Sequence, residues 1–289
     1  MTALIPVLLF AALGLLLVTG AVGLALALLG TRPADPVMAG GPRADAPAGP
    51  ITSAAIGWAL GASLGLLVVA LGLRALATGH APWSNLHEFS IAFGAAVLAV
   101  HLALARTYPI AGFGPLIALL AAALVGFGLG RDDRIQPLVP ALQQPLLLTV
   151  HVGSAVVAYA VAGVAFVAAL GELAQRAAAD RIAVLPSAEV ARIVTHRAVL
   201  IGFPILTLAI VLGSVWANLA WRSYWSNDPK ELAAAATWLV FGAYLHVAGR
   251  TDRLARLAPW LVVLGFAGVV FTYIAAGLFI VGQHSYGTP

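Results

Sequence analysis

Eight runs of about 20 mostly apolar residues follow one another along this chain, separated by short polar connections. A helix needs about 20 such residues to cross the hydrocarbon core of a bilayer. The sequence therefore predicts an all-α fold, a polytopic membrane helical bundle of about eight transmembrane helices in a single integral membrane domain, residues 1–289. The predicted spans cover residues 4–29, 53–77, 87–106, 110–128, 145–170, 198–218, 232–249 and 258–281.

The composition excludes several classes of protein. Only 9% of the residues are charged and 62% are hydrophobic, whereas a soluble domain has about 25% charged residues. No cysteine is present, so the chain has no disulfide and no thiolate metal site, and any thiol chemistry must use the sulfur of a partner. The 15 lysines and arginines lie mostly in short connections, which fits membrane topology better than nucleic-acid binding, and we expect no nucleic-acid partner.

Two connections and the first run have distinct features. The first run lacks the basic start and the small-residue cleavage site of a secretory signal, so we expect a retained helix. The Pro/Gly/Ala-rich residues after it predict a flexible cytoplasmic loop over residues 31–52. Scattered charges between Gly171 and His196 predict a short amphipathic or interfacial helical piece.

The segment Gly213–Glu231, here called the tryptophan segment, differs most from its surroundings and reads GSVWANLAWRSYWSNDPKE. It lies between two strongly apolar runs. It contains aromatic rings and a few charged side chains: Trp216, Trp221, Tyr224, Trp225, Arg222, Asp228 and Lys230. Such a set indicates a binding site for a large, flat, partly charged molecule at a membrane surface.

The distribution of basic residues predicts an orientation. If the tryptophan segment is placed outside the cytoplasm, the inner connections hold ten of the lysines and arginines and the outer connections hold five. Because inner connections carry the excess of basic residues, we expect the tryptophan segment and both termini on the outer face.

Two histidines share the predicted depth of the tryptophan segment. His151 lies near the start of the fifth run and His284 follows the eighth run. Two neutral imidazoles can ligate one haem iron while aromatic rings cover the porphyrin, and Arg222 or Lys230 can meet the propionates. The alternative is that each histidine is an interfacial residue hydrogen-bonded to backbone.

Further histidines lie elsewhere in the predicted spans. His246 is near the inner end of the seventh run, and an ionisable side chain in a span suggests a function. His101 lies at a similar depth in the third run. The two could form an inner axial pair, but for His101 we favour a hydrogen bond to a neighbouring helix.

The segment GHAPWSNLHEFS carries two more histidines, His80 and His87. We expect a turn through Asn85 that starts the next helix, with Glu88 in its first turn. For both histidines we expect packing beneath the tryptophan segment, and for His196 an ordinary place at the inner surface.

The residues from Gly202 to Glu231, GFPILTLAIVLGSVWANLAWRSYWSNDPKE, resemble the tryptophan-rich WWD signature of haem-handling proteins of cytochrome c maturation. These are the CcsA (ResC) proteins and the related CcmC and CcmF. GHAPWSNLHEFS is similar to the GH-x-P-x-SNL-x-E segment of CcsA, LLLTVHVGSAVVAYA to its helix that begins with a histidine, and GQHSYG to its GLHSYG-like ending. The similarity runs in order over residues 79–289, and the chain is identified as a member of the CcsA/ResC family.

The resemblance implies roles for individual residues. In that family the histidines that correspond to His151 and His284 flank the external haem site. The histidine that corresponds to His246 belongs to an inner haem site, whose other ligand comes from the partner CcsB (ResB). The family signature has glycine where this chain has Arg222, and tryptophan where it has Asn227.

The resemblance also implies a function. Haem b would enter through the inner site, dock on the outer face beneath Trp216, Trp221, Tyr224 and Trp225, and be presented to the CXXCH cysteines of apocytochrome c. The chain would be a subunit of a CcsB–CcsA (ResB–ResC) holocytochrome c synthase, or haem lyase, and inactive alone. We expect it in the plasma membrane of a bacterium or a thylakoid-type membrane. The alternatives are a membrane b-type cytochrome for electron transfer and a HemX-like regulatory membrane protein.

Overall fold

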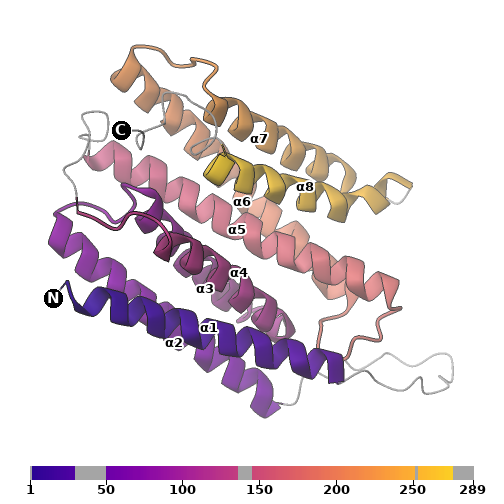
Figure 1. Cartoon of the computed structure of the whole chain (residues 1–289). Helices are drawn as coiled ribbons and strands as arrows, with labels where there is room; N and C mark the ends of the chain where they lie inside the picture. The colour runs from indigo at the N-terminus through magenta and orange to yellow at the C-terminus, as the bar shows by residue number, and fades with distance from the viewer. Residues whose placement is uncertain (1, 30–49, 136–144, 251–252, 276–289) are drawn as a thin grey trace, which may run out of the picture.

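The computed structural model describes residues 2–29, 50–135, 145–250 and 253–275. Within these ranges the chain is helical and contains no strand. Eight α-helices run up and down through the bundle (Figure 1), which confirms the predicted all-α fold. Their bounds are α1 Leu4–Leu29, α2 Pro50–Thr78, α3 Leu86–Leu104, α4 Gly114–Leu129, α5 Pro145–Ala177, α6 Ala188–Trp221, α7 Pro229–Val247 and α8 Ala258–Val270.

Three short helical turns complete the described structure. A 3-10 turn, Ala111–Phe113, precedes α4, and another, Arg253–Leu257, precedes α8. A π-helical turn, Phe271–Ala275, continues α8, and the rest of the predicted span 258–281 lies outside the described residues. The predicted loop 31–52 also lies outside them, except for its last three residues, which begin α2.

Seven helical segments of the described chain are long and apolar enough to cross a membrane. The chain is therefore an integral membrane protein, as its composition predicts. Helix α7 does not reach that standard, since it carries Lys230 and Glu231 in its first turn and Tyr244 and His246 near its end. The prediction of about eight spans thus holds for the number of helices, while α7 is distinct in its polarity.

The connection between α5 and α6 differs from the prediction. No separate amphipathic helix occupies residues 171–196, because most of the charged residues there lie on the last turns of α5 and the first turns of α6, and only Asp180 and Arg181 lie in the connection between them. Glu172 pairs with Arg176 at 2.5 Å across one helical turn, a spacing that supports helix. The buried amide of Gln175 donates to the carbonyl oxygens of Ile182, Leu185 and Pro186 at 2.9–3.1 Å, which closes the connection.

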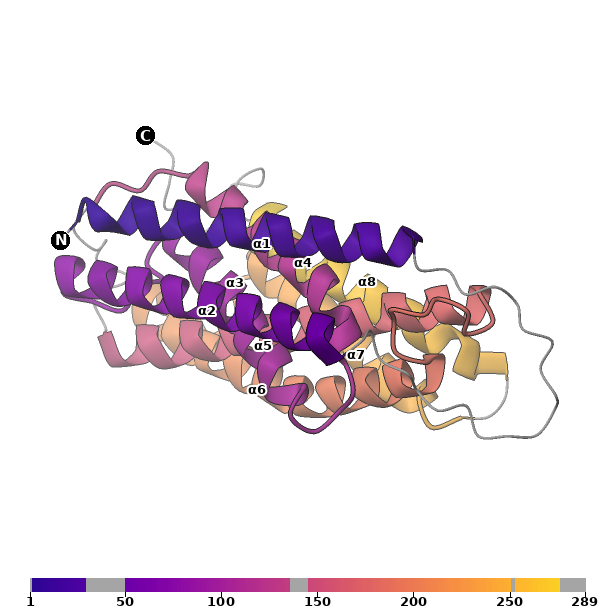
Figure 2. The ribbon, with the colours of Figure 1, turned by 90° about the horizontal axis from the view of Figure 1, so that it is seen from below.

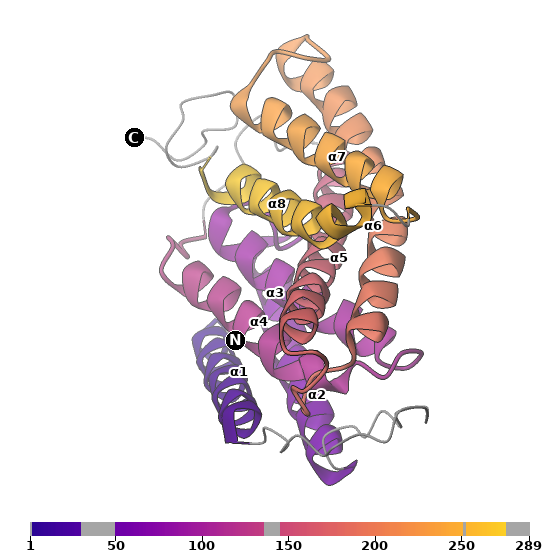
Figure 3. The same ribbon diagram turned by 90° about the vertical axis from the view of Figure 1, so that its right-hand side faces the viewer.

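Helix α5 lies at the centre of the bundle and packs against α3, α6 and α8. Helices α7 and α8 lie on one side of it and α3 and α4 on the other (Figure 3). Helix α1 is peripheral and contacts α2 and α4 (Figure 2). The end of the bundle that carries residues 222–228, here called the tryptophan end, also carries the start of α5 and the α2–α3 connection (Figure 1).

Candidate functional site

The tryptophan segment is mostly helical. Its first part, through Trp221, forms the last turns of α6, and its last three residues begin α7. Only residues 222–228 are irregular, so the loop is shorter than predicted. Trp216 is buried, with 4% of its surface exposed, and its ring lies 5.4 Å from that of Trp221. Tyr224 and Trp225 are 61% and 43% exposed, so the irregular part presents two aromatic rings to the surroundings.

Two residues of the tryptophan segment adopt left-handed backbone conformations. Arg222 ends α6 with φ 59° and its N–H bonds to the carbonyl oxygen of Asn218. Asn227 has φ 57°, and its side-chain oxygen accepts the indole N–H of Trp225 at 2.9 Å. Glycine is favoured at a left-handed helix end because it has no Cβ, and asparagine is tolerated there. The geometry explains why glycine suits the place of Arg222.

The last residues of the segment form a capping box that starts α7. Asp228 is the N-cap, and its side chain accepts the N–H of Lys230 at 2.9 Å, with Pro229 at the first helical position. The Glu231 carboxylate accepts the backbone N–H groups of Ser226 and Asp228 at 2.8 and 3.2 Å. Asp228 is 4% exposed. The chain's own hydrogen bonds therefore hold the shape of the irregular part.

His151 lies two turns inside α5, against α6. Its Nδ1 is 2.9 Å from the carbonyl oxygen of Ala209, and its ring is 5.7 Å from the ring of Trp216. A Cβ on Gly213 would come within 2.8 Å of the His151 Cε1 atom, so a glycine there permits the close approach. The hydrogen bond assigns the proton to Nδ1 and the lone pair to Nε2, which is the orientation of a metal-ligating histidine.

The two readings of His151 are thus compatible. Its ring is hydrogen-bonded to backbone, which is the alternative to a role as haem ligand. The same hydrogen bond also gives the ring the orientation that a metal ligand needs. His284 lies outside the described residues, so the structure does not place the second predicted ligand. Among the described residues no three His, Cys, Asp or Glu side chains gather as a metal-ion site. Haem differs from such a site, because its iron takes only axial ligands from protein.

Lys230 lies partly buried at the start of α7, beside Asp228. Burial lowers the pKa of its ammonium group, and the carboxylate of Asp228 opposes that shift. Arg222, in contrast, is exposed. Both cations that are predicted to meet the propionates therefore lie at the tryptophan end, where Lys230 is partly buried and Arg222 is exposed.

The structure does not bring His246 and His101 together. His246 is exposed on α7, with its Nδ1 2.8 Å from the carbonyl oxygen of Gly242. His101 is buried in α3, and its Nδ1 has no hydrogen-bond partner within the described ranges. Helices α5 and α8 lie between α7 and α3 (Figure 3). Within the described ranges, Nδ1 of His101 therefore does not make the predicted hydrogen bond. His101 and His246 do not form a pair.

The GHAPWSNLHEFS segment begins α3 as predicted. The side chain of Asn85 caps the helix by accepting the N–H of Glu88 at 2.9 Å. His87 packs against α4, with Nδ1 2.9 Å from the carbonyl oxygen of Gly128, and not beneath the tryptophan segment. The Nδ1 atom of His80 lies 2.9 Å from the carbonyl oxygen of its neighbour Ala81. His196, on α6, lies 3.5 Å from the hydroxyl of Tyr244.

A buried ion pair joins this segment to α2. Nε of Arg74 donates to a Glu88 carboxylate oxygen at 2.8 Å, and both residues are almost fully buried. Ser84 donates to the other carboxylate oxygen through its N–H and its hydroxyl, at 2.9 and 2.8 Å. Nη2 of Arg74 and Nε1 of Trp83 are buried without a partner in the part of the chain that the structure describes. Sequence reasoning missed Arg74, although a charged residue inside a predicted span is a usable signal.

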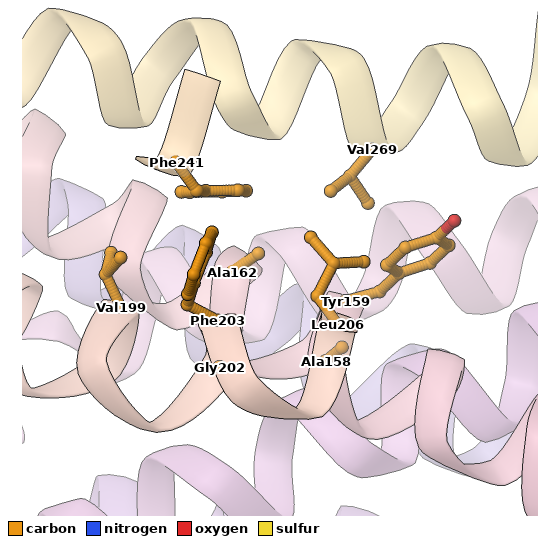
Figure 4. Close-up of a pocket in the computed structure, with 9 residues that line it drawn as sticks. All are labelled: Ala158, Tyr159, Ala162, Val199, Gly202, Phe203, Leu206, Phe241 and Val269. Atoms are coloured by element: carbon orange, nitrogen blue, oxygen red, sulfur yellow. The ribbon is translucent and has the colours of Figure 1, made fainter. Parts of the chain in front are cut away.

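A pocket lies between α5, α6, α7 and α8 (Figure 4). Its empty volume is about 280 Å³, counting the part that is open. The lining is apolar except for the hydroxyl of Tyr159, and it includes Phe203, Phe241 and Val269 from the other three helices. On α5 and α6 it lies between His151 and Trp216 at one end and Glu172 and His196 at the other.

These features define a polytopic membrane protein with an aromatic, imidazole-bearing site at one end of its bundle. Residues 83–284 match the family model described as Cytochrome C assembly protein. The cytochrome c biogenesis protein CcsA of Parasynechococcus marenigrum is 33% identical over 260 residues, covering 77% of this chain and 83% of that protein. The CcsA of Chlamydomonas reinhardtii is 33% identical over 243 residues, covering 79% and 67%. The chain therefore belongs to the cytochrome c assembly protein family.

A solved structure has the same fold. The cytochrome c haem lyase CcmF superposes on 92% of this chain with a TM-score of 0.64 and 22% identity, and this chain corresponds to 46% of that one. The likeness extends the shared fold beyond CcsA proteins.

Proposed function

We propose that this chain acts in cytochrome c biogenesis by binding haem at the tryptophan end and presenting it to apocytochrome c. The observation that carries the proposal is the position of His151. Its imidazole is fixed by the Ala209 carbonyl, lies beside Trp216 and occupies the space that Gly213 leaves open. Family membership supports the same function, because relatives named for cytochrome c biogenesis align over most of the chain.

The described residues fit haem as a substrate. Nε2 of His151 is the lone-pair atom that an axial ligand needs. Trp216 lies beside it, Trp221 lies beside Trp216, and Tyr224 and Trp225 are exposed close by in the chain, so aromatic rings can cover a macrocycle. When bound, haem supplies iron and the vinyl groups that become thioethers with the CXXCH cysteines. This chain contributes no thiol, since it has no cysteine.

His284 is the proposed second axial ligand, and Arg222 and Lys230 are the proposed partners of the propionates. Because Lys230 is partly buried, its ammonium group pairs with a carboxylate more strongly than an exposed one. The capping hydrogen bonds of Asp228 and Glu231 hold Lys230 and the irregular part in place. Asp228 then acts on haem only indirectly, by positioning its neighbours.

At the opposite end of the bundle, His246 is the proposed inner site for haem b made in the cytoplasm. Its exposed place on α7 means that the second ligand would come from another chain, a CcsB/ResB-like membrane protein. The pocket of about 280 Å³ is slightly smaller than sites for drug-sized ligands, which have ~300–1,000 Å³. Passage of haem along it would therefore require α5–α6 and α7–α8 to separate.

The tryptophan end is proposed to face away from the cytoplasm, in a bacterial plasma membrane or a thylakoid-type membrane. The excess of basic residues at the opposite end supports this orientation. It also places the proposed haem site where apocytochrome c is matured.

An absorption spectrum of the chain purified with its partner tests the proposal. Wild type should show six-coordinate haem, and His151→Ala and His284→Ala should each weaken that spectrum and reduce cytochrome c maturation. His80→Ala is the matched control, because His80 lies at the same end and its imidazole bonds to the carbonyl oxygen of its own neighbour, Ala81. If both ligand variants keep an unchanged spectrum and full maturation, the ligand assignment is wrong.

An electron-transfer cytochrome b is the less favoured alternative. It needs two imidazoles that face each other inside the bundle, and within the described ranges His101 and His246 do not meet. Redox titration with a quinol separates the two functions, since only the electron-transfer protein should reduce its haem at a quinol-dependent rate. A HemX-like regulator would leave c-type cytochromes present when the gene is deleted.

A further inference from the structure

The first turns of α5, which carry His151, show little burial. Leu146 is 79% exposed and Val150 44%. Among the α5 residues whose side chains the structure describes, Val156 is the first buried one. A helix end with so little buried surface opens at a low cost in free energy. The position of the His151 imidazole therefore depends on the few contacts that this end of α5 makes.

Two contacts hold this end of α5, and they come from opposite sides. Helix α6 holds His151 through the carbonyl oxygen of Ala209 and through the space at Gly213. On the other side lies Trp83 of the α2–α3 connection. A Cβ at Gly153 would lie 3.8 and 3.9 Å from Cζ2 and Cη2 of the Trp83 ring, which is van der Waals contact. At 100° per residue, Gly153 lies about 200° around the helix axis from His151.

The orientation of the Trp83 ring fits this contact. Its Nε1 atom is buried, and a single ring carbon separates Nε1 from Cζ2. The two atoms therefore share the edge of the ring that is turned inward, while the residue as a whole is half-buried. Trp83 thus packs edge-on against the start of α5 at Gly153.

Hydrogen bonds on both sides of Trp83 hold it in that position. Its backbone N–H donates to the carbonyl oxygen of Ala81 at 3.0 Å. The next residue, Ser84, donates its N–H and its hydroxyl to the Glu88 carboxylate at 2.9 and 2.8 Å. Glu88 in turn pairs with Arg74 of α2 at 2.8 Å, and both side chains are almost fully buried. The connection that carries Trp83 is therefore anchored to α2 and to α3.

We propose that Trp83 is a positioning residue for His151, because it holds the first turns of α5 against α6. Without it, this end of α5 would loosen and the Nε2 atom of His151 would be displaced. A misplacement of about 1 Å in a functional group can cost about 100-fold in rate. The contact of Trp83 with α5 rests on the structure alone, whereas its consequence for haem rests on the proposed function. The segment pattern GH-x-P-x-SNL-x-E leaves the position of Trp83 open, so the residue lies outside that signature.

Hydrogen–deuterium exchange of the full chain in lipid nanodiscs, without haem, tests the contact. Trp83→Ala should speed exchange of the amides of residues 149–156 by about tenfold or more. Trp83→Phe, which keeps an aromatic edge, should stay close to the wild-type rate. The matched control is Trp58→Ala, because Trp58 is 81% exposed on α2, and it should leave these amides unchanged. If Trp83→Ala does not accumulate in the membrane, Trp83→Leu has the same expected direction, and exchange at the wild-type rate would overturn the proposal.

The spectrum of haem in the chain purified with its partner reports on His151 itself. In Trp83→Ala, part of the six-coordinate signal should convert to a five-coordinate one. Added imidazole should restore six-coordination, since the free base occupies the place of a displaced ligand, and His151→Ala with imidazole is the positive control. Unfolding alone would lower the haem content without this imidazole-sensitive form. An unchanged spectrum, or a loss that imidazole does not reverse, would remove Trp83 from the positioning of His151.

The two measurements separate this inference from the proposed function. If haem binding weakens in Trp83→Ala while exchange in the haem-free chain stays at the wild-type rate, Trp83 contacts haem directly and the positioning role is wrong. If exchange becomes faster in Trp83→Ala but His151 proves dispensable for the six-coordinate spectrum and for maturation, the contact with α5 stands and the proposed function fails.

Discussion

Gly213 on α6 lies against the imidazole of His151 on α5, so close that a Cβ in its place would come within 2.8 Å of Cε1. The same ring is held from α6 by the carbonyl oxygen of Ala209, at 2.9 Å from Nδ1. The orientation of this histidine thus depends on two residues of α6, one of which contributes only the absence of a side chain. This relationship makes the proposed ligand geometry testable away from the ligand.

Gly213→Ala should displace the His151 ring. Forcing an extra methyl group into a packed contact costs about 1–3 kcal/mol, and the hydrogen bond to Ala209 should lengthen. We expect weaker haem binding and a lower melting temperature, measured by haem titration and thermal unfolding of the purified complex. The control is Gly61→Ala, because no heavy atom lies within 4 Å of a Cβ at Gly61. Equal effects of the two substitutions would contradict the proposed contact.

Arg222→Gly should stabilise the protein. Arg222 has φ 59°, and a left-handed conformation costs an ordinary residue about 1–2 kcal/mol. The melting temperature should rise, whereas Arg197→Gly, on an exposed helical position of α6, should lower it by the ~1 kcal/mol cost of glycine in a helix. Arg222→Gly should weaken haem binding although it stabilises the protein, because the proposed propionate partner is lost. If Arg222→Gly lowered the melting temperature, the contacts of the Arg222 side chain would contribute more to stability than its left-handed backbone costs.

Much of the fold could be predicted because its signals are local. Apolar runs of spanning length predict eight helices, and Asn85 with Glu88 three residues later marks the start of α3. The capping box of Asp228 and Glu231 has an equally local signature, although sequence reasoning assigned Asp228 to haem binding. The charges of residues 171–196 were misleading, since ion pairs within the ends of two long helices resemble an interfacial helix in composition alone.

The contacts that make the candidate site could not be predicted in this way. His151 and Ala209 are 58 residues apart, and nothing in the sequence marks a backbone carbonyl as a partner. Gly213 has no signal beyond being a glycine in a helix. The exposure of His246 likewise follows from how α7 packs on α6 and α8. Such features depend on tertiary packing, which periodicity does not encode.

Breaking the ion pair between Arg74 and Glu88 should be strongly destabilising. Removal of one partner leaves a buried charge uncompensated, at a cost of about 3–5 kcal/mol, so Glu88→Gln should greatly lower the melting temperature or the yield. The double variant Arg74→Met/Glu88→Met should be more stable than either single variant. The exposed pair Asp132–Arg134 is the control, since such pairs contribute about 0–1 kcal/mol and Asp132→Asn should have little effect. Additive effects of the two changes at positions 74 and 88 would show that the pair is not coupled.

Binding of haem should depend on pH through Lys230. Burial lowers the pKa of Lys230, so its positive charge is lost below the pH at which an ordinary lysine, of pKa about 10.4, deprotonates. For the protein without haem, the cost of burying the ammonium is present below the lowered pKa and is relieved as the pH rises through it. For haem binding the sign is opposite, because the propionate loses its cationic partner over the same range. Haem affinity, measured by titration at increasing pH, should therefore fall as Lys230 deprotonates.

Two variants are the controls for this pH dependence. Lys230→Arg should keep the affinity constant over that range, since a guanidinium stays protonated, and Lys230→Met should bind haem weakly at every pH. A decline with pH that persists unchanged in Lys230→Arg would assign the titration to another group.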